Sequence, residues 1–251
     1  MEHSLLFFDC YCQVGRYGTP GPGEPLEPRE VLDAMQRAGI SRALAIHALA
    51  KELAPIEGND LIVMLAREHQ WIEPCWVAMP HHTREMPAAG VLLAAMRNSG
   101  VRSVRLFPSL HGWRMNEYGT GELLSALGAA CVPTFVDLDQ TNWDEVDQVC
   151  ATHPGLPLVV LRVTYRIDRT LYPLLEKHQN LRIEISGYQP HRGIEEIAAR
   201  FGAHRLLFGS GLPVFEPGSA VAMVTYAELP EDQKQMIAAA NLEALLAQAK
   251  P

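Results

Sequence analysis

Hydrophobic positions along the chain follow two alternating patterns. Short runs rich in β-branched and aromatic residues are separated by longer stretches in which apolar residues recur at helical spacing. This alternation is typical of successive strand–helix units around a parallel sheet. Eight runs have the character of strands, and they cover residues 5–11, 43–48, 72–79, 101–107, 132–138, 158–163, 181–186 and 205–209.

The stretches between these runs predict helices. They cover residues 29–38, 61–69, 87–98, 122–130, 143–152, 171–177 and 194–201, and a further helix is expected over 231–248. Gly39, Gly100 and Gly202 follow three of them, where a left-handed residue commonly ends a helix. A Gly/Pro-rich loop at 17–25 follows the first strand, and no linker divides the chain.

Eight strand–helix units predict a closed (β/α)8 barrel, the TIM-barrel fold, formed by residues 1–251 as a single α/β domain. Closure is favoured because it leaves no sheet edge unpaired. An open, doubly wound sheet is the alternative. In a barrel, the loop at 17–25 would lie over the mouth.

Side-chain alternation within each strand predicts which residues line the barrel. The inward set is polar: Asp9, Tyr11, Gln13, His47, Arg105, Asp137, Asp139, Arg162, Arg182, Glu184 and Ser186. The outward set, expected to pack under the helices, is apolar: Phe8, Cys10, Cys12, Leu44, Ile46, Val104, Leu106, Val136, Leu138, Leu161, Val163, Leu181, Ile183 and Ile185. Buried charges are costly unless they are matched, so the inward set predicts either a ligand pocket at the carboxyl ends of the strands or a structural ion-pair network.

Composition narrows the classes of partner. The chain has 251 residues and a net charge of −8, and it has no cluster of Lys and Arg, which argues against a nucleic-acid surface. No apolar run approaches the roughly 18 residues that cross a bilayer. The amino-terminal Met-Glu-His-Ser lacks the basic region of a secretory signal, so a cytoplasmic protein is expected. Five scattered cysteines predict reduced thiols.

Several segments carry a family resemblance. Residues 201–213, Phe-Gly-Ala-His-Arg-Leu-Leu-Phe-Gly-Ser-Gly-Leu-Pro, resemble the last-strand signature of the amidohydrolase-related family, which includes metal-dependent hydrolases and decarboxylases. Residues 104–108, the helix ending Asn-Leu-Glu-Ala-Leu-Leu, and Asp9-x-Tyr11-x-Gln13, which resembles the family's DxHxH opening, are similar too. The resemblance implies the same barrel fold. Homo-oligomers are common in the family, so the resemblance also allows a homo-oligomer for this chain.

The same comparison implies that the family's metal ligands are missing. Tyr11 and Gln13 stand where the family has two histidines, Asp137 and Arg162 stand at two further histidine positions, and Gly211 replaces the catalytic aspartate. A divalent ion needs three or four converging donors, so neither a metal nor another cofactor is expected. Our hypothesis is that Arg162, paired with Asp137, takes the place of the ion.

The expected reaction is hydrolysis, or a related lyase reaction, of a small anionic organic molecule. Proton transfer is assigned to Asp137 and Glu184. Substrate binding is assigned to six residues: Tyr11, Gln13, His47, Arg105, Arg162 and His111. Two alternatives stay open: a non-catalytic barrel that binds a metabolite or a partner protein, and a metal-dependent hydrolase with relocated ligands among His47, His81 or His82, and His111.

Overall fold

The computed structural model describes residues 5–251 and contains alternating strands and helices throughout. The amino-terminal Met-Glu-His-Ser, used above to argue against a secretory signal, lies outside the described residues. The strands are β1 (Phe7–Val14), β2 (Ile40–His47), β3 (Ile72–Pro74), β4 (Trp76–Ala78), β5 (Val104–Leu106), β6 (Thr134–Asp137), β7 (Leu158–Leu161), β8 (Leu181–Glu184) and β9 (Leu206–Leu207). The helices are α1 (Pro28–Arg37), α2 (Ala48–Glu52), α3 (Pro55–Glu68), α4 (Ala89–Ser99), α5 (Glu117–Ala129), α6 (Trp143–Thr152), α7 (Asp168–Lys177), α8 (Gly193–Phe201), α9 (Gly218–Thr225), α10 (Glu231–Gln235) and α11 (Asn241–Gln248).

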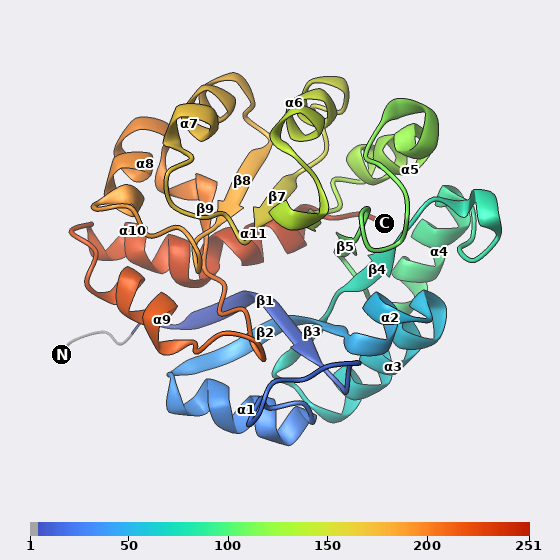
Figure 1. Cartoon of the computed structure of the whole chain (residues 1–251), viewed down its shortest axis with the longest axis horizontal. Coiled ribbons are helices and arrows are strands. Elements are labelled where there is room, and N and C mark those ends of the chain that lie inside the picture. Colours follow the sequence, from blue (N-terminus) through green and yellow to red (C-terminus); the bar gives the residue numbers. More distant parts are fainter. Residues whose placement is uncertain (1–4) are drawn as a thin grey trace.

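The strands form a closed parallel barrel, which confirms the predicted (β/α)8 fold (Figure 1). β3 and β4 are two parts of one strand, interrupted at Cys75, whose N–H donates to the Ala45 carbonyl at 2.9 Å. The barrel closes between β1 and the segment after β9. There the Cys10 N–H donates to the Phe208 carbonyl and the Gln13 N–H donates to the Leu212 carbonyl, both at 3.0 Å.

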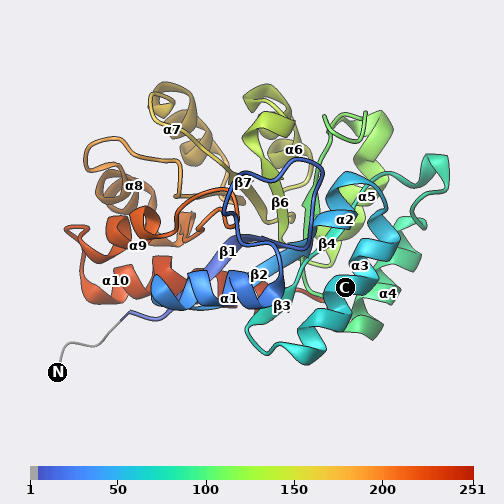
Figure 2. The ribbon, with the colours of Figure 1, turned by 60° about the horizontal axis from the view of Figure 1, so that its bottom comes forward.

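The helices surround the strands, and α11 covers the amino-terminal end of the barrel (Figures 1 and 2). Leu242, Leu245 and Leu246 of α11 pack in one cluster with Phe8 of β1 and other residues that fill the barrel. The predicted helix over 231–248 is present, but a π-helical segment, Met236–Ala240, separates α10 from α11. The short helices α2 and α9 were not predicted.

The predicted side-chain facing is confirmed for the apolar residues of β5, β6 and β8. Val104 and Leu106 of β5, Val136 of β6, and Ile183 of β8 pack in the outer cluster with the helices. The positive φ expected at the three helix ends is present, with 78° at Gly39, 73° at Gly100 and 96° at Gly202. Gly100 is left-handed, whereas Gly202 has ψ of 143° and is outside the left-handed helical region. These strands keep a regular register with their neighbours, so alternation assigns their faces correctly.

The predicted facing is wrong in β1, β2 and β7. Phe8, Cys10, Leu44, Ile46 and Leu161 were placed under the helices, but they lie in the inner cluster, whereas Cys12 lies in the outer one. The register between β1 and β2 shifts between Asp9 and Cys12, so alternation is broken there. Strands of a parallel barrel are apolar on both faces. In β2 and β7 the hydrophobic pattern therefore does not show which face points into the barrel.

The Gly/Pro-rich loop after β1 lies against α2, at the carboxyl end of β2 (Figure 2). The Gly18 N–H donates to Glu52 Oε2 at 2.7 Å, and the Gly15 N–H donates to the Leu26 carbonyl at 2.7 Å. No helix within residues 5–251 has the length and apolar character to span a bilayer.

Candidate active site at the barrel mouth

A buried ion pair joins Arg105 of β5 to Asp137 at the end of β6. Arg105 Nη2 lies 2.6 Å from Asp137 Oδ1 and 2.7 Å from Oδ2, and Nε lies 3.1 Å from Oδ1. The two side chains are only 6% and 5% exposed. The guanidinium also lies over the Tyr11 ring, 4.5 Å from its centroid. Burial acts to lower the pKa of Arg105, but Asp137 and Tyr11 together with weaker contributions raise it, so the guanidinium stays charged.

The hypothesis that Arg162 pairs with Asp137 is therefore wrong. Arg162 directly follows β7 and has a left-handed backbone, with φ of 56°. Its side chain therefore does not follow the inward and outward alternation of the strand. Its Nη1 lies 2.8 Å from Asp139 Oδ2, and the two side chains are 41% and 50% exposed. The guanidinium inside the barrel is Arg105, and Arg162 lies at the mouth.

Glu184, at the end of β8, is the most deeply buried of the predicted site residues. Its side chain is fully buried, and its carboxylate accepts hydrogen bonds from the N–H groups of Arg162, at 3.2 Å, and Ser186. Burial raises the pKa of Glu184 to about 7, so the carboxyl can gain or lose a proton near neutral pH. Gly209 makes room for it, since a Cβ there would lie 2.5 Å from Glu184 Cγ.

Asp9 is a second buried carboxylate, and it links β1 to the segment that closes the barrel. Its Oδ1 accepts hydrogen bonds from the N–H groups of Tyr11 and Ser210, both at 2.8 Å, and Oδ2 accepts one from the Ser210 hydroxyl. Burial raises the pKa of Asp9 to about 6. These contacts give Asp9 a structural role in barrel closure.

A cavity of about 610 Å³ opens at the carboxyl ends of β6 to β9, and Glu184 is not among the residues that line it. Arg162 and Ser186, whose N–H groups bind Glu184, line the cavity together with Ser210. The other lining residues are polar or aromatic for the most part: Leu138, Asp139, Thr164, Tyr165, Gly187, Gln189, Phe215, Glu216 and Ser219.

The other predicted binding residues lie away from this lining. The Tyr11 hydroxyl lies 3.5 Å from Asp137 Oδ2, beside the buried ion pair, and Gln13 is 7% exposed on β1. His47 Nδ1 accepts a hydrogen bond from the Leu49 N–H at 3.1 Å, which caps α2, and burial lowers the pKa of His47. His47 therefore helps to form α2.

His111 also contacts α2. Its Nε2 lies 2.6 Å from the Lys51 carbonyl oxygen, and its Nδ1 is buried with no hydrogen-bond partner among residues 5–251. Sequence reasoning missed Lys51 and Phe215, which both lie at the mouth. Lys51 is on a helix too short to show periodicity, and Phe215 follows a strand of two residues.

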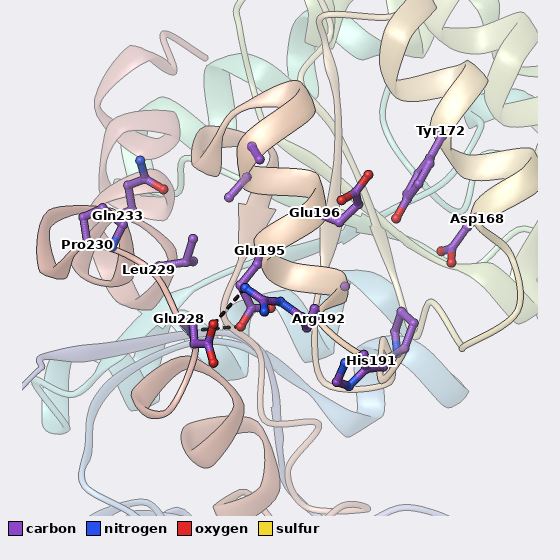
Figure 3. Close-up of a pocket in the computed structure, with 14 residues that line it drawn as sticks. Asp168, Tyr172, His191, Arg192, Glu195, Glu196, Glu228, Leu229, Pro230 and Gln233 are labelled. Carbon is purple, nitrogen blue, oxygen red and sulfur yellow. Dashed lines mark hydrogen bonds and ion pairs between the residues drawn. The ribbon is translucent and has the colours of Figure 1, made fainter.

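A second, outer groove of about 740 Å³ lies between α7, α8 and the segment before α10 (Figure 3). Its lining is acidic, with Glu195, Glu196, Glu228 and Asp168. Arg192 Nη2 lies 2.8 Å from Glu228 Oε2, so the one arginine of the lining is already paired. The groove is outside the barrel and holds none of the predicted site residues.

Comparison with known proteins places this geometry in a family. A family model described as Amidohydrolase matches residues 20–247. The chain belongs to the amidohydrolase family. No curated protein sequence gives a significant match. The similar proteins described next are therefore solved structures.

Three solved structures share the amidohydrolase barrel. An uncharacterized TIM-barrel protein from Bordetella bronchiseptica superposes with a TM-score of 0.79 at 18% identity, covering 98% of this chain and 100% of that chain. A manganese-bound 5-carboxyvanillate decarboxylase from Novosphingobium aromaticivorans gives 0.78 at 12% identity, covering 98% of each chain. A candidate 2-pyrone-4,6-dicarboxylic acid hydrolase from Pseudomonas putida gives 0.72 at 18%, covering 98% of this chain and 99% of that one. These identities establish the fold alone.

The residues at the mouth do not fit a divalent ion of the kind that the decarboxylase holds. Among residues 5–251, no three His, Cys, Asp or Glu side chains converge in a way that could hold a metal. Asp137, which stands at one of the family's histidine positions, has both oxygens bonded to Arg105. A guanidinium beside the position of an ion would repel it.

Proposed function

We propose that this amidohydrolase-family protein is an enzyme that cleaves a small organic acid at the barrel mouth, by hydrolysis or a related lyase reaction, without the usual metal ion. One observation carries the proposal. The cavity is lined by Arg162 and Ser186, and the backbone N–H groups of these two residues bind the buried Glu184 carboxylate. Cytoplasmic location, a single domain and assembly into a homo-oligomer stay predictions.

Arg162 is proposed to bind the carboxylate of the substrate. Its side chain is 41% exposed and lines the cavity. Nη1 bonds to Asp139 and the guanidinium lies over the Phe215 ring, 5.5 Å from its centroid, and among residues 5–251 no other side chain bonds to its N–H donors. Phe215 and Tyr165 offer apolar ring surface, and Ser219 and Gln189 offer hydrogen-bonding groups. A small acid with an apolar or hydroxylated body matches these walls, and the relatives named as acting on aromatic acids support that class of ligand.

Glu184 is proposed to carry the proton. Its pKa of about 7 allows it to act as acid or base near neutral pH. Asp137, the other residue assigned to proton transfer, is held in three contacts by Arg105. Asp137 is therefore better placed to orient Arg105 and Tyr11 than to exchange a proton with a ligand.

A thermal-shift screen with small carboxylates, lactones and divalent ions tests the proposal. A ligand at a hundredfold excess over Kd stabilises by about 2.7 kcal/mol, which shifts Tm by roughly 5 to 11 °C in a chain of this size. Arg162→Met is expected to abolish the shift caused by organic anions. Arg42→Met is the matched control, because Arg42 is equally exposed at 42%, pairs with Glu243 at 3.1 Å and lies over the Phe8 ring.

The same screen separates the alternatives. Turnover of a stabilising ligand, followed by NMR, supports an enzyme, whereas binding without turnover supports a non-catalytic barrel. The pairing of Asp137 with Arg105 is compatible with that second alternative, because it keeps Asp137 from exchanging a proton with a ligand. Stabilisation by zinc or manganese would support relocated metal ligands. If no organic anion shifts Tm, or if Arg162→Met leaves the shift unchanged, the proposal fails.

A further inference from the structure

The cavity at the carboxyl ends of β6 to β9 carries more negative than positive charge. Among the described residues that line it, Arg162 is the one cationic side chain, and Asp139 and Glu216 are carboxylates, which leaves a net charge of −1. Arg162 Nη1 bonds to Asp139 Oδ2 at 2.8 Å, so this pair is neutral as a unit. Glu216 is exposed, and among residues 5–251 no side-chain nitrogen of Lys, Arg or His lies within 4.0 Å of its carboxylate. Glu216 is therefore the unmatched charge of the lining.

Two buried carboxyl groups lie behind the lining. Ser186 and Ser210 both line the cavity. The Ser186 N–H donates to the Glu184 carboxylate, and the Ser210 N–H donates to Asp9 Oδ1 at 2.8 Å. Burial raises the pKa of Glu184 to about 7 and that of Asp9 to about 6, so both groups are at least partly ionised at neutral pH. Their charge adds to the negative potential that Glu216 creates in the cavity.

This distribution of charge sets a condition on the ligand. A carboxylate bound at Arg162 brings a further negative charge into a cavity that already has an unmatched one, and like charges repel. A ligand that also carries an ammonium group brings the missing positive charge. The exposed Glu216 carboxylate can accept hydrogen bonds from that group, and a bond between two charged partners is stronger than a neutral one.

The aromatic rings of the lining suit the body of the ligand and not its ammonium group. The Arg162 Cζ lies 5.5 Å from the Phe215 ring centroid, and the Arg166 Cζ lies 5.2 Å from that of Tyr165. A second cation at either ring would be repelled by the guanidinium that is already there. Phe215 and Tyr165 are still 41% and 56% exposed, so they leave surface for an apolar group. Glu216 directly follows Phe215 in the chain, which places a carboxylate next to that surface.

We propose that the organic acid that binds at the barrel mouth is a zwitterion. Its carboxylate binds to Arg162, its ammonium group binds to Glu216, and an apolar body, such as an aromatic ring, contacts Phe215. The inference rests on the proposed function, because it uses the same cavity and the same arginine, and it names the class of acid: amino acids and other acids that carry an alkylammonium group.

Two matched pairs of ligands test this inference. L-Phenylalanine differs from 3-phenylpropanoate by one ammonium group, and 4-(aminomethyl)benzoate differs from 4-methylbenzoate in the same way but has its two charges at opposite ends of a ring. Isothermal titration calorimetry on the full chain at neutral pH and low salt, where charges are least screened, measures the four Kd values. We expect at least one zwitterion to bind about two- to fivefold more tightly than its partner without the ammonium group, as an exposed charge pair provides.

Glu216→Gln identifies the residue that causes the preference. The change keeps the size of the side chain and removes its charge, so it should weaken binding of the zwitterion, tighten binding of the plain acid and bring their Kd values together. Glu176→Gln is the matched control and should leave the preference unchanged. Glu176 is exposed on α7 and does not line the cavity, and among residues 5–251 no cationic side chain lies within 4.0 Å of its carboxylate.

Three outcomes overturn the inference. They are equal Kd values within both pairs, a preference that keeps its full size in Glu216→Gln, and no binding by any of the four ligands. The first needs no variant, so a folding defect does not obscure it. The proposed function gives a separate result: plain acids that bind as tightly as the zwitterions, and that Arg162→Met prevents from binding, refute the zwitterion and leave the proposed acid site standing.

Discussion

Breaking the Arg105–Asp137 pair should destabilise the protein strongly. Asp137→Asn keeps the shape of the side chain but leaves the Arg105 guanidinium, 6% exposed, without its counter-ion. Removing one partner of a buried pair costs about 3–5 kcal/mol. For a chain of this length, that corresponds to a fall in Tm of roughly 6 to 20 °C. Urea unfolding followed by circular dichroism and by tryptophan fluorescence measures the change and checks that the transition is two-state.

A double replacement and a surface pair provide the controls. Arg105→Met with Asp137→Leu removes both charges and should recover most of the stability, because apolar groups can replace a buried ion pair at little cost. Glu196→Gln breaks the half-exposed pair with Arg200 at 3.4 Å and should cost at most about 1 kcal/mol. A loss below about 1 kcal/mol in Asp137→Asn would show that the pair is hydrated, and would refute the buried charge at the barrel axis.

Three further outcomes are expected. The pKa of Glu184 is raised from 4.5 to about 7, so its contribution to stability is complete below about pH 4.5 and is lost as pH rises through 7. Urea unfolding should show a fall on the order of 3 kcal/mol from Glu184, in addition to a fall from Asp9, whose pKa is raised from 3.8 to about 6. A total fall that is as large in Glu184→Gln as in the wild-type protein would contradict the Glu184 assignment. Gly211→Ala should destabilise the protein more than Gly100→Ala. Both glycines have φ of 73°, but only at Gly211 would a Cβ collide with the Phe215 ring. Equal losses of stability in thermal melts would show that the Phe215 ring moves aside without cost. Cys131 should be the fast-reacting thiol toward a disulfide reagent, since the other four cysteines are buried, and a fast phase that survives in Cys131→Ser would contradict the assignment.

The inward position of Arg105 and Asp137 could be located from the sequence, but their pairing could not, and of the eight predicted site residues only Arg162 lines the cavity. Arg105 and Asp137 were both placed inside the barrel, because each sits between apolar neighbours in a regular strand. Which arginine pairs with Asp137 depends on the distance between side chains of neighbouring strands. β5 lies next to β6 and brings Arg105 to Asp137, while the left-handed backbone at Arg162 turns its side chain toward Asp139.

The sequence by itself determined the barrel, since alternating strand and helix periods admit few other folds and the helix ends carry glycine where φ must be positive. Only the tertiary structure decided which face of β1 and β2 is inside, because an irregular register near Asp9 shifts the alternation and both faces of a parallel strand are apolar. It also brought Lys51, on a helix of five residues, over Phe107. Periodicity records contacts made within one element, whereas a site is made by elements that meet only after the chain has folded.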